Sequence, residues 1–82
     1  MLRVVLRSFA QIRELVGRDA VEVELPVRST IADAWGELLV RAPKLGGLTT
    51  STRVARNGVL AAFDDELAEG DEVAFLPPFG GG

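Results

Sequence analysis

The residues best suited to chemistry stand at the end of the chain, where Gly80, Gly81 and Gly82 follow one another. Because glycine has no Cβ, such a tail can enter a narrow channel and leaves its last carbonyl open to attack. A terminal carboxylate that ATP has activated as an acyl-adenylate can then accept sulfur or an amine. We therefore expect Gly82 to carry the reacting carboxylate and Gly81 to be its unhindered neighbour. The alternative is a terminus without a chemical role.

The residues before the glycines favour a tail that projects from the body of the protein. Pro77 and Pro78 are stiff and hold the chain extended. Residues 77–82 then span at most about 20 Å, which is long enough to reach into a partner's active site. Phe79 has no local core to bury it, so we expect it to anchor in a partner's cleft. Its alternative role is to pack back on the domain.

The composition excludes most side-chain chemistry. The chain has 82 residues, with 9 basic and 12 acidic side chains and no Cys, His or Tyr. Disulfides, cysteine nucleophiles, thiolate or imidazole zinc sites and imidazole-based triads are therefore excluded, and only an oxygen-ligated metal site remains possible. We expect no bound metal or cofactor. The phosphate-binding glycine motifs are also missing, so any adenylation with ATP must be carried out by another protein.

Charge and hydropathy exclude two classes of partner. The basic residues are outnumbered and scattered, which argues against a nucleic-acid partner. The longest charge-free run is Val73 to Gly82, which is ten residues, whereas a membrane span needs about 20. Arg3 and Arg7 interrupt the apolar N-terminal segment, so it does not resemble a signal peptide. We expect a cytoplasmic protein without a membrane partner.

The first third of the chain predicts two strands around a short helix. Apolar residues alternate over 2–7 and over 20–25, which is typical of strands. Between them, Ser8 and Gln11 have the spacing of a capping box, and Gly17 is a typical helix stop. If the strands pair, the acidic side chains of the second (Glu22, Glu24) should face the basic ones of the first (Arg3, Arg7).

The rest of the chain predicts the main helix and three short strands. Thr30 and Asp33 are suited to begin a helix over 31–42, in which Trp35 faces the core. Residues 45–52 are rich in Gly and Thr and are expected to form a loop. Asn57-Gly58 predicts a hairpin. The three strands are expected at 53–56, 59–62 and 73–76.

This order predicts an α+β domain over residues 1–76, with the main helix on one face of a mixed sheet of about five strands, followed by the tail 77–82. If Val73 and Phe75 face the core, Leu76 faces outward, and Leu60 lies outward or at the rim. These apolar residues near the root of the tail suggest a contact surface, although loops could also cover them. The acidic residues of 64–72 are expected to be a solvated connection, or to steer the chain toward a basic partner.

The sequence resembles the MoaD/ThiS family of ubiquitin-like sulfur carriers, and in particular the molybdopterin branch of that family. Residues 9–17 (FAQIRELVG) are similar to the family's first helix, and Asn57 matches a common hairpin residue. Leu67 and residues 69–75 resemble the segment before the last strand. The most specific match is Pro77-Pro78 followed by the terminal Gly81-Gly82. The resemblance covers nearly the whole chain and is weakest over 41–52.

The resemblance implies a β-grasp fold, as in ubiquitin, with the first and last strands adjacent and parallel. It also implies a carrier that is not an enzyme on its own. A ubiquitin-activating-type adenylating enzyme would activate Gly82 with ATP, and a sulfur donor (a sulfurtransferase or desulfurase) would convert the carboxylate to a thiocarboxylate. The tail would then enter the large catalytic subunit of molybdopterin synthase and pass sulfur to cyclic pyranopterin monophosphate.

The same resemblance implies which other residues contact partners. Leu76 and Leu60 fall at family contact positions, and Arg13 on the first helix is a further contact candidate. Gly80 stands where the family varies, and it should lengthen the tail without changing its chemistry. Three other hypotheses for the function stay open. The protein could be a sulfur carrier for another pathway such as the thiazole of thiamine, a protein modifier joined to lysines, or an interaction domain whose tail is incidental.

Overall fold

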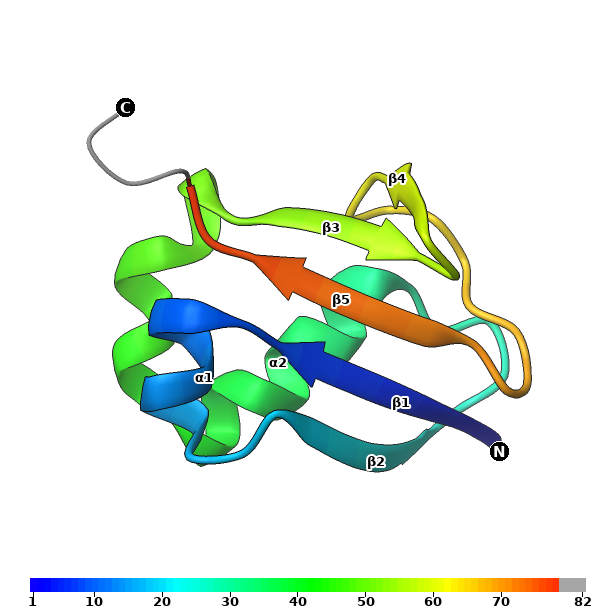
Figure 1. Ribbon diagram of the computed structural model, residues 1–82. Coiled ribbons are helices and arrows are strands. Elements are labelled where there is room, and N and C mark those ends of the chain that lie inside the picture. The colour runs from blue at the N-terminus through cyan, green and yellow to red at the C-terminus, as the bar shows by residue number, and fades with distance from the viewer. Residues whose placement is uncertain (79–82) are drawn as a thin grey trace.

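In the computed structural model, which describes residues 1–78, a mixed sheet lies in front of the main helix, and the short first helix lies at the end of the sheet where β1 finishes (Figure 1). The sheet order is β2-β1-β5-β3-β4, with β1 and β5 parallel and the other neighbours antiparallel. This arrangement confirms the expected β-grasp fold, in which the first and last strands pair at the centre. The strands are β1 (Leu2–Ser8), β2 (Ala20–Leu25), β3 (Arg53–Arg56), β4 (Val59–Ala61) and β5 (Glu72–Leu76).

Alternation along the strands divides the sheet into a buried and an open face. Val4 and Leu6 of β1 are fully buried, and so are Val73 and Phe75 of β5. The residues between them point to the other side, where no helix packs (Figure 1). Since the side-chain period of a strand is two, this division confirms that the side chain of Leu76 belongs to the outer face.

The expected capping box at Ser8 is wrong. Ser8 is the last residue of β1, its backbone N–H donates to the Asp19 carbonyl oxygen at 3.0 Å, and its side chain is buried. The helix α1 (Ala10–Val16) begins instead at Phe9, which provides no side-chain cap. The inward alternation of β1 continues through Ser8, so the ladder takes precedence over the local cap. Gly17 ends α1 in the left-handed conformation, with φ 86°, as expected.

The main helix α2 (Ile31–Arg41) begins as the sequence predicts. The Thr30 hydroxyl accepts a hydrogen bond from the Asp33 N–H at 3.3 Å, and the Asp33 carboxylate accepts one from the Thr30 N–H at 2.8 Å. The first two N–H groups of the helix, those of Ile31 and Ala32, donate to the carbonyl oxygens of Asp65 and Phe63. The acidic segment therefore covers the start of α2 and satisfies donors that a helix cannot satisfy itself.

The expected loop over 45–52 is wrong, because Pro43–Ser51 forms a 3-10 helix, η1. Leu45 is fully buried, and η1 packs against α2. The Trp35 Nε1–H donates to the Thr49 hydroxyl at 2.9 Å, and the Trp35 ring lies 5.0 Å from that of Phe75. The composition of this segment predicted a loop because it carries Gly and Thr, but its contacts with Trp35 order it.

The expected ion pairs between β1 and β2 are half right. The register places Arg3 opposite Glu24, with 3.6 Å between their charged groups, but it places Ala20 opposite Arg7. Arg7 contacts Glu72 of β5 instead, at 3.5 Å. The second carboxylate is therefore supplied by β5 and not by β2.

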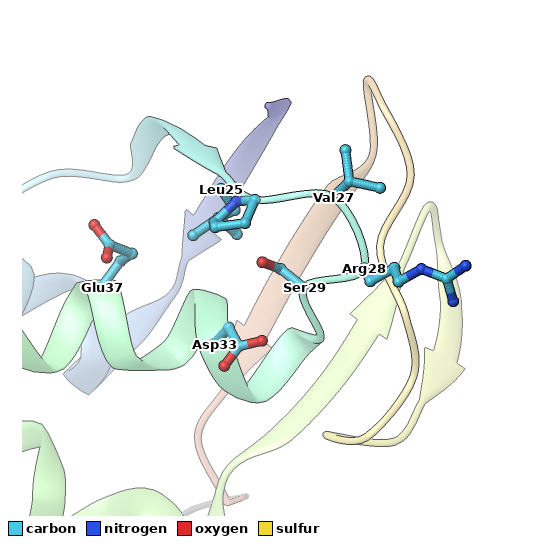
Figure 2. Close-up of a pocket in the computed structure, with 7 residues that line it drawn as sticks. Leu25, Val27, Arg28, Ser29, Asp33 and Glu37 are labelled. Carbon is cyan, nitrogen blue, oxygen red and sulfur yellow. The ribbon is translucent and has the colours of Figure 1, made fainter.

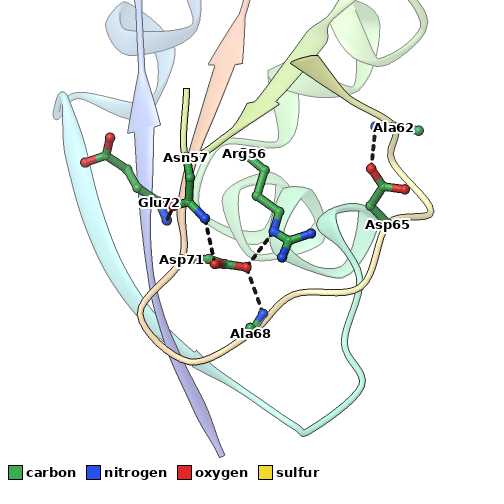
Figure 3. Close-up of polar contacts among 7 residues, drawn as sticks. All are labelled: Arg56, Asn57, Ala62, Asp65, Ala68, Asp71 and Glu72. Atoms are coloured by element: carbon green, nitrogen blue, oxygen red, sulfur yellow. Dashed lines mark hydrogen bonds and ion pairs between the residues drawn. The ribbon is translucent and has the colours of Figure 1, made fainter. Parts of the chain in front are cut away.

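Asp71 is the exception in the acidic segment that we expected to be solvated, because only 6% of its surface is exposed. Its carboxylate accepts hydrogen bonds from the Arg56 Nε at 2.8 Å, the Asn57 Nδ2 at 2.9 Å and the Ala68 N–H at 2.8 Å (Figure 3). The Asn57 side-chain oxygen also accepts from the Glu72 N–H. This cluster ties the β3–β4 hairpin to the first residue of β5.

The same contacts control the ionisation of Asp71. Burial by itself raises the pKa of a carboxyl group, but the Asn57 amide, the Ala68 N–H and the Arg56 guanidinium outweigh it and hold the pKa of Asp71 below its ordinary value of 3.8. Because the folded pKa is depressed, the ionised carboxylate stabilises the fold above the ordinary value. This contribution is lost as the pH falls through the folded pKa.

We expect Asp71→Asn to lower the free energy of unfolding by about 2 kcal/mol at pH 7, because charge-assisted hydrogen bonds are lost from a buried site. Part of the decline in stability at acid pH should also disappear in this variant. Denaturant unfolding at pH 7 and in the acid range measures both effects. Asp64→Asn, at an exposed carboxylate, is the matched control and should change stability by less than about 0.5 kcal/mol. Equal stability of the two variants at pH 7 would contradict this role of Asp71.

We expect Thr49→Val to lower the free energy of unfolding by about 1–2 kcal/mol, because it keeps the volume but removes the acceptor of the buried Trp35 N–H. Chemical denaturation followed by Trp35 fluorescence measures the loss. Thr50→Val, at the exposed neighbouring position, controls for the β-branched replacement. If both variants unfold at the same denaturant concentration, the hydrogen bond does not order η1.

Candidate functional site

The root of the tail is held by strands on both sides. Leu76 ends β5, and its register partner on β3 is Arg53. On the other side of β5, Phe75 lies opposite Ser8 of β1. Pro77 is half-buried and Pro78 is exposed. The chain therefore leaves the sheet from a fixed position, at the end where β1 also finishes (Figure 1).

The outer face of the sheet carries a strip of small and apolar residues beside this root. The register aligns Leu60 of β4 with Ala55 of β3, and Ala55 with Ala74 of β5. Leu76 lies one position further along the same face of β5. Leu60 is 71% exposed, which confirms its predicted outward position. Leu60, Ala55, Ala74 and Leu76 are called the apolar strip below.

Two arginines border the apolar strip. Arg53 is exposed beside Leu76, and Arg7 pairs in register with Ala74. The Arg7 guanidinium contacts Glu72 and lies 5.9 Å from the centre of the Phe9 ring. Within residues 1–78 its Nε is buried without a hydrogen-bond partner. Arg7 thus places a partly exposed cation beside the strip, while its unpartnered Nε is closed off from solvent.

The other predicted site residues are placed differently. Arg13 is exposed on α1, beyond the C-terminal end of β1, so it shares the tail end of the molecule but does not belong to the apolar strip. Phe79, Gly80, Gly81 and Gly82 lie outside the described residues. The structure therefore places Leu60 and Leu76 on one face of the sheet, with Pro77 directly after Leu76, and places Arg13 on α1.

Sequence reasoning missed two features of the site. It did not find that Ala55 and Ala74 connect Leu60 with Leu76, because this depends on the register between three strands. It also missed Arg53 and Arg7 as the border of the strip. The available signal was their position: each lies at an odd-numbered, outward position of a strand that could be predicted from its alternation.

Metal clusters and membrane-spanning helices can both be sought in the described residues. Over residues 1–78, no group of three or more acidic, Cys or His side chains is arranged to hold a metal ion. In the same part of the chain, no helix is long and apolar enough to cross a bilayer. The arrangement of the described residues is an exposed apolar side chain, Leu60, on the same face of the sheet as the strand from which the chain leaves at Leu76.

The profile of the ThiS family matches residues 6–82 of this chain. A curated relative, the molybdopterin synthase sulfur carrier subunit of Escherichia coli, is 39% identical over 83 residues, and the match covers 90% of this chain and 93% of that protein. Small archaeal modifier protein 1 of Haloferax volcanii is 35% identical over 84 residues, with 93% and 97% covered.

Solved structures agree in fold. The crystal structure of the Haloferax volcanii modifier has a TM-score of 0.86 and 31% identity, and the match covers 98% of this chain and 99% of that one. A complex of subunits 1 and 2 of the molybdopterin-converting factor from Helicobacter pylori gives a TM-score of 0.67 at 21% identity, which is a likeness of fold alone, over 99% of this chain and 100% of the matched one. The chain therefore belongs to the ThiS family and has the β-grasp fold of its ubiquitin-like members.

Proposed function

We propose that this protein is a sulfur carrier that acts as the small subunit of molybdopterin synthase. The observation that carries the proposal is the tail root, which leaves the sheet beside the apolar strip in a member of the ThiS family. The 39% identity to a molybdopterin synthase sulfur carrier subunit supports this branch of the family. The protein would donate sulfur, while its larger partner would supply the catalytic side chains.

The proposed chemistry takes place at the carboxylate of Gly82. A carboxylate oxygen attacks the α-phosphate of ATP on the adenylating enzyme, and pyrophosphate leaves. A hydrosulfide equivalent from the sulfur donor then attacks the acyl carbon, and AMP leaves with the former carboxylate oxygen. The product is a thiocarboxylate, whose sulfur is transferred to cyclic pyranopterin monophosphate in the large subunit. Gly81 and Gly80 leave the approach to this carbon unhindered.

The apolar strip gives the docking step a physical basis. Leu60 is exposed, and its burial by a partner would remove a large apolar side chain from water, which favours binding by about 1.5–3 kcal/mol. Arg53 and Arg7 at the border would fix the orientation through carboxylate or carbonyl acceptors. Phe79 and Pro78 would continue the contact into the partner's channel.

A second function, as a protein modifier, is favoured by the 35% identity to small archaeal modifier protein 1. The same activated Gly82 would then react with a lysine amine in place of sulfur. Lys44 is the only lysine in the sequence, so self-linked chains could form only through this residue. Higher-mass conjugates on a denaturing gel that vanish when Gly82 is deleted would establish this function. If no such conjugates form in cells that make the thiocarboxylate, the protein is not a modifier.

We expect the intact mass to increase by about 16 Da when the chain is incubated with the adenylating enzyme, ATP and a sulfur donor, because one oxygen is replaced by sulfur. Mass spectrometry of the whole chain measures the gain. A variant without Gly82 should remain unmodified. If the Escherichia coli relative gains mass in the same reaction and this chain does not, the proposal is wrong.

We expect Leu60→Glu to weaken binding to the large subunit by about tenfold or more, since it places a charge in an apolar contact. Titration calorimetry with the full chain measures the affinity. Val40→Glu is the matched control, because Val40 is 80% exposed on α2, away from the apolar strip. Equal affinities for the two variants would show that the strip is not the docking surface.

A further inference from the structure

Among the described residues, β2 is an edge strand that pairs only with β1, and it lies at the opposite end of the sheet from β4. The Ser8 N–H donates to the Asp19 carbonyl oxygen, and hydrogen-bonded pairs alternate along an antiparallel ladder. Val21 and Val23 therefore direct their backbone groups toward β1. Those of Glu22 and Glu24 point away from the sheet, where the described residues provide no further strand.

This edge is long enough to accept another strand. β2 has six residues, whereas the other edge strand, β4, has three. Unpaired edges readily pair with another chain, and an extended peptide that adds to an edge is a common mode of recognition. The edge of β2 thus offers a row of donors and acceptors that the fold itself leaves unused.

An open groove continues from this edge toward α2. It has a volume of about 460 Å³ and lies between the end of β2 at Leu25, the turn at Val27 and Arg28, and the first half of α2. Asp33 and Glu37 of α2 and Arg28 of the turn line the groove (Figure 2). The Asp33 carboxylate accepts a hydrogen bond from the Thr30 N–H, and that of Glu37 lies 3.9 Å from the Arg41 guanidinium. A strand added to β2 would place its inward side chains over this groove.

The charged side chains around the edge of β2 indicate which kind of peptide would bind there. Glu22 and Glu24 are exposed on the outer face, and Asp33 and Glu37 line the groove on the inner side. The contact of Glu24 with Arg3, at 3.6 Å, joins two side chains that are each 60% exposed, so solvent screens it. An added strand would therefore meet the carboxylates of Glu22 and Glu24 on its outer face, whereas on the inner face Arg28 offsets the partnered carboxylates of the groove.

A second copy of this chain fits the edge poorly. In an antiparallel pair of two β2 edges, the residues that face outward pair with one another, which brings Glu22 and Glu24 of the two copies together. Like charges directly opposite each other destabilise a sheet. A strand with Lys or Arg at these positions would convert the same contacts into attraction.

We propose that the edge of β2 binds an extended peptide segment that carries Lys or Arg, and that the segment joins the sheet as a sixth strand. This site is separate from the apolar strip, because β1 lies between β2 and the strip residues of β5. The proposal does not depend on sulfur transfer. It permits a partner to hold the carrier by this edge while the tail is engaged elsewhere.

The test is an NMR titration of the full chain with a synthetic peptide of about eight residues that alternates Lys and Val, a length typical of strands. We expect the amide signals of Ala20, Glu22 and Glu24 to shift and their hydrogen exchange to slow. In the free protein these amides should exchange faster than those of Val21 and Val23. The same peptide with N-methyl groups on alternate residues keeps its charge but cannot pair. It should bind about tenfold more weakly.

Two variants with the same change in charge distinguish binding at the edge of β2 from non-specific electrostatic attraction of the peptide. Glu22→Lys should weaken peptide binding by about tenfold, whereas Glu66→Lys, at an exposed position in the acidic segment, should change it by less than about twofold. If Glu22→Lys does not fold, the N-methylated peptide provides the same distinction with the unaltered chain. Equal binding of the two peptides, shifts centred on residues 64–72, or no shifts at millimolar peptide would each overturn the proposal.

Discussion

The parallel pairing of β1 with β5 is the contact on which the rest of the structure depends. It joins the first strand of the chain to the last, with Leu6 opposite Val73 and Ser8 opposite Phe75. Phe75 is fully buried and lies against Trp35, so the central strands also hold α2 in place. Because β5 is inserted between β1 and β3, the point at which the tail leaves the sheet is determined by long-range contacts. A change that loosens either neighbour would move the root of the tail.

Local patterns predicted the elements well, and long-range contacts account for what they missed. Alternation gave β2 with its observed bounds, and Thr30 with Asp33 gave the start of α2. Ser8 was assigned to a helix cap because the capping spacing is local, whereas its burial results from pairing with β2 and β5. The role of Asp71 depends on Arg56 and Asn57, which are about fifteen residues earlier in the chain. Such a contact has no periodic signature in the sequence.

In the candidate site, too, local patterns predicted the positions of residues but not their long-range contacts. The outward positions of Leu60 and Leu76 follow from a period of two and could be predicted. Their connection through Ala55 and Ala74 could not, because it requires the register of β3 against both neighbours. The Asp71 cluster holds the hairpin to β5 and so helps to maintain this register. A buried carboxylate far from the tail therefore helps to keep Leu60 aligned with the outer face of β5.

The direction of the two central strands also has a consequence for how the protein can be joined to others. Since β1 and β5 run in parallel, the chain enters the sheet at one end and leaves it at the other (Figure 1). A domain or affinity label fused ahead of Met1 would lie far from Pro78 and from the tail that follows it. Under the proposed function, the same fusion placed after Gly82 would convert the reacting carboxylate to an amide. An N-terminal fusion is therefore compatible with the proposed sulfur transfer, whereas a C-terminal fusion is not.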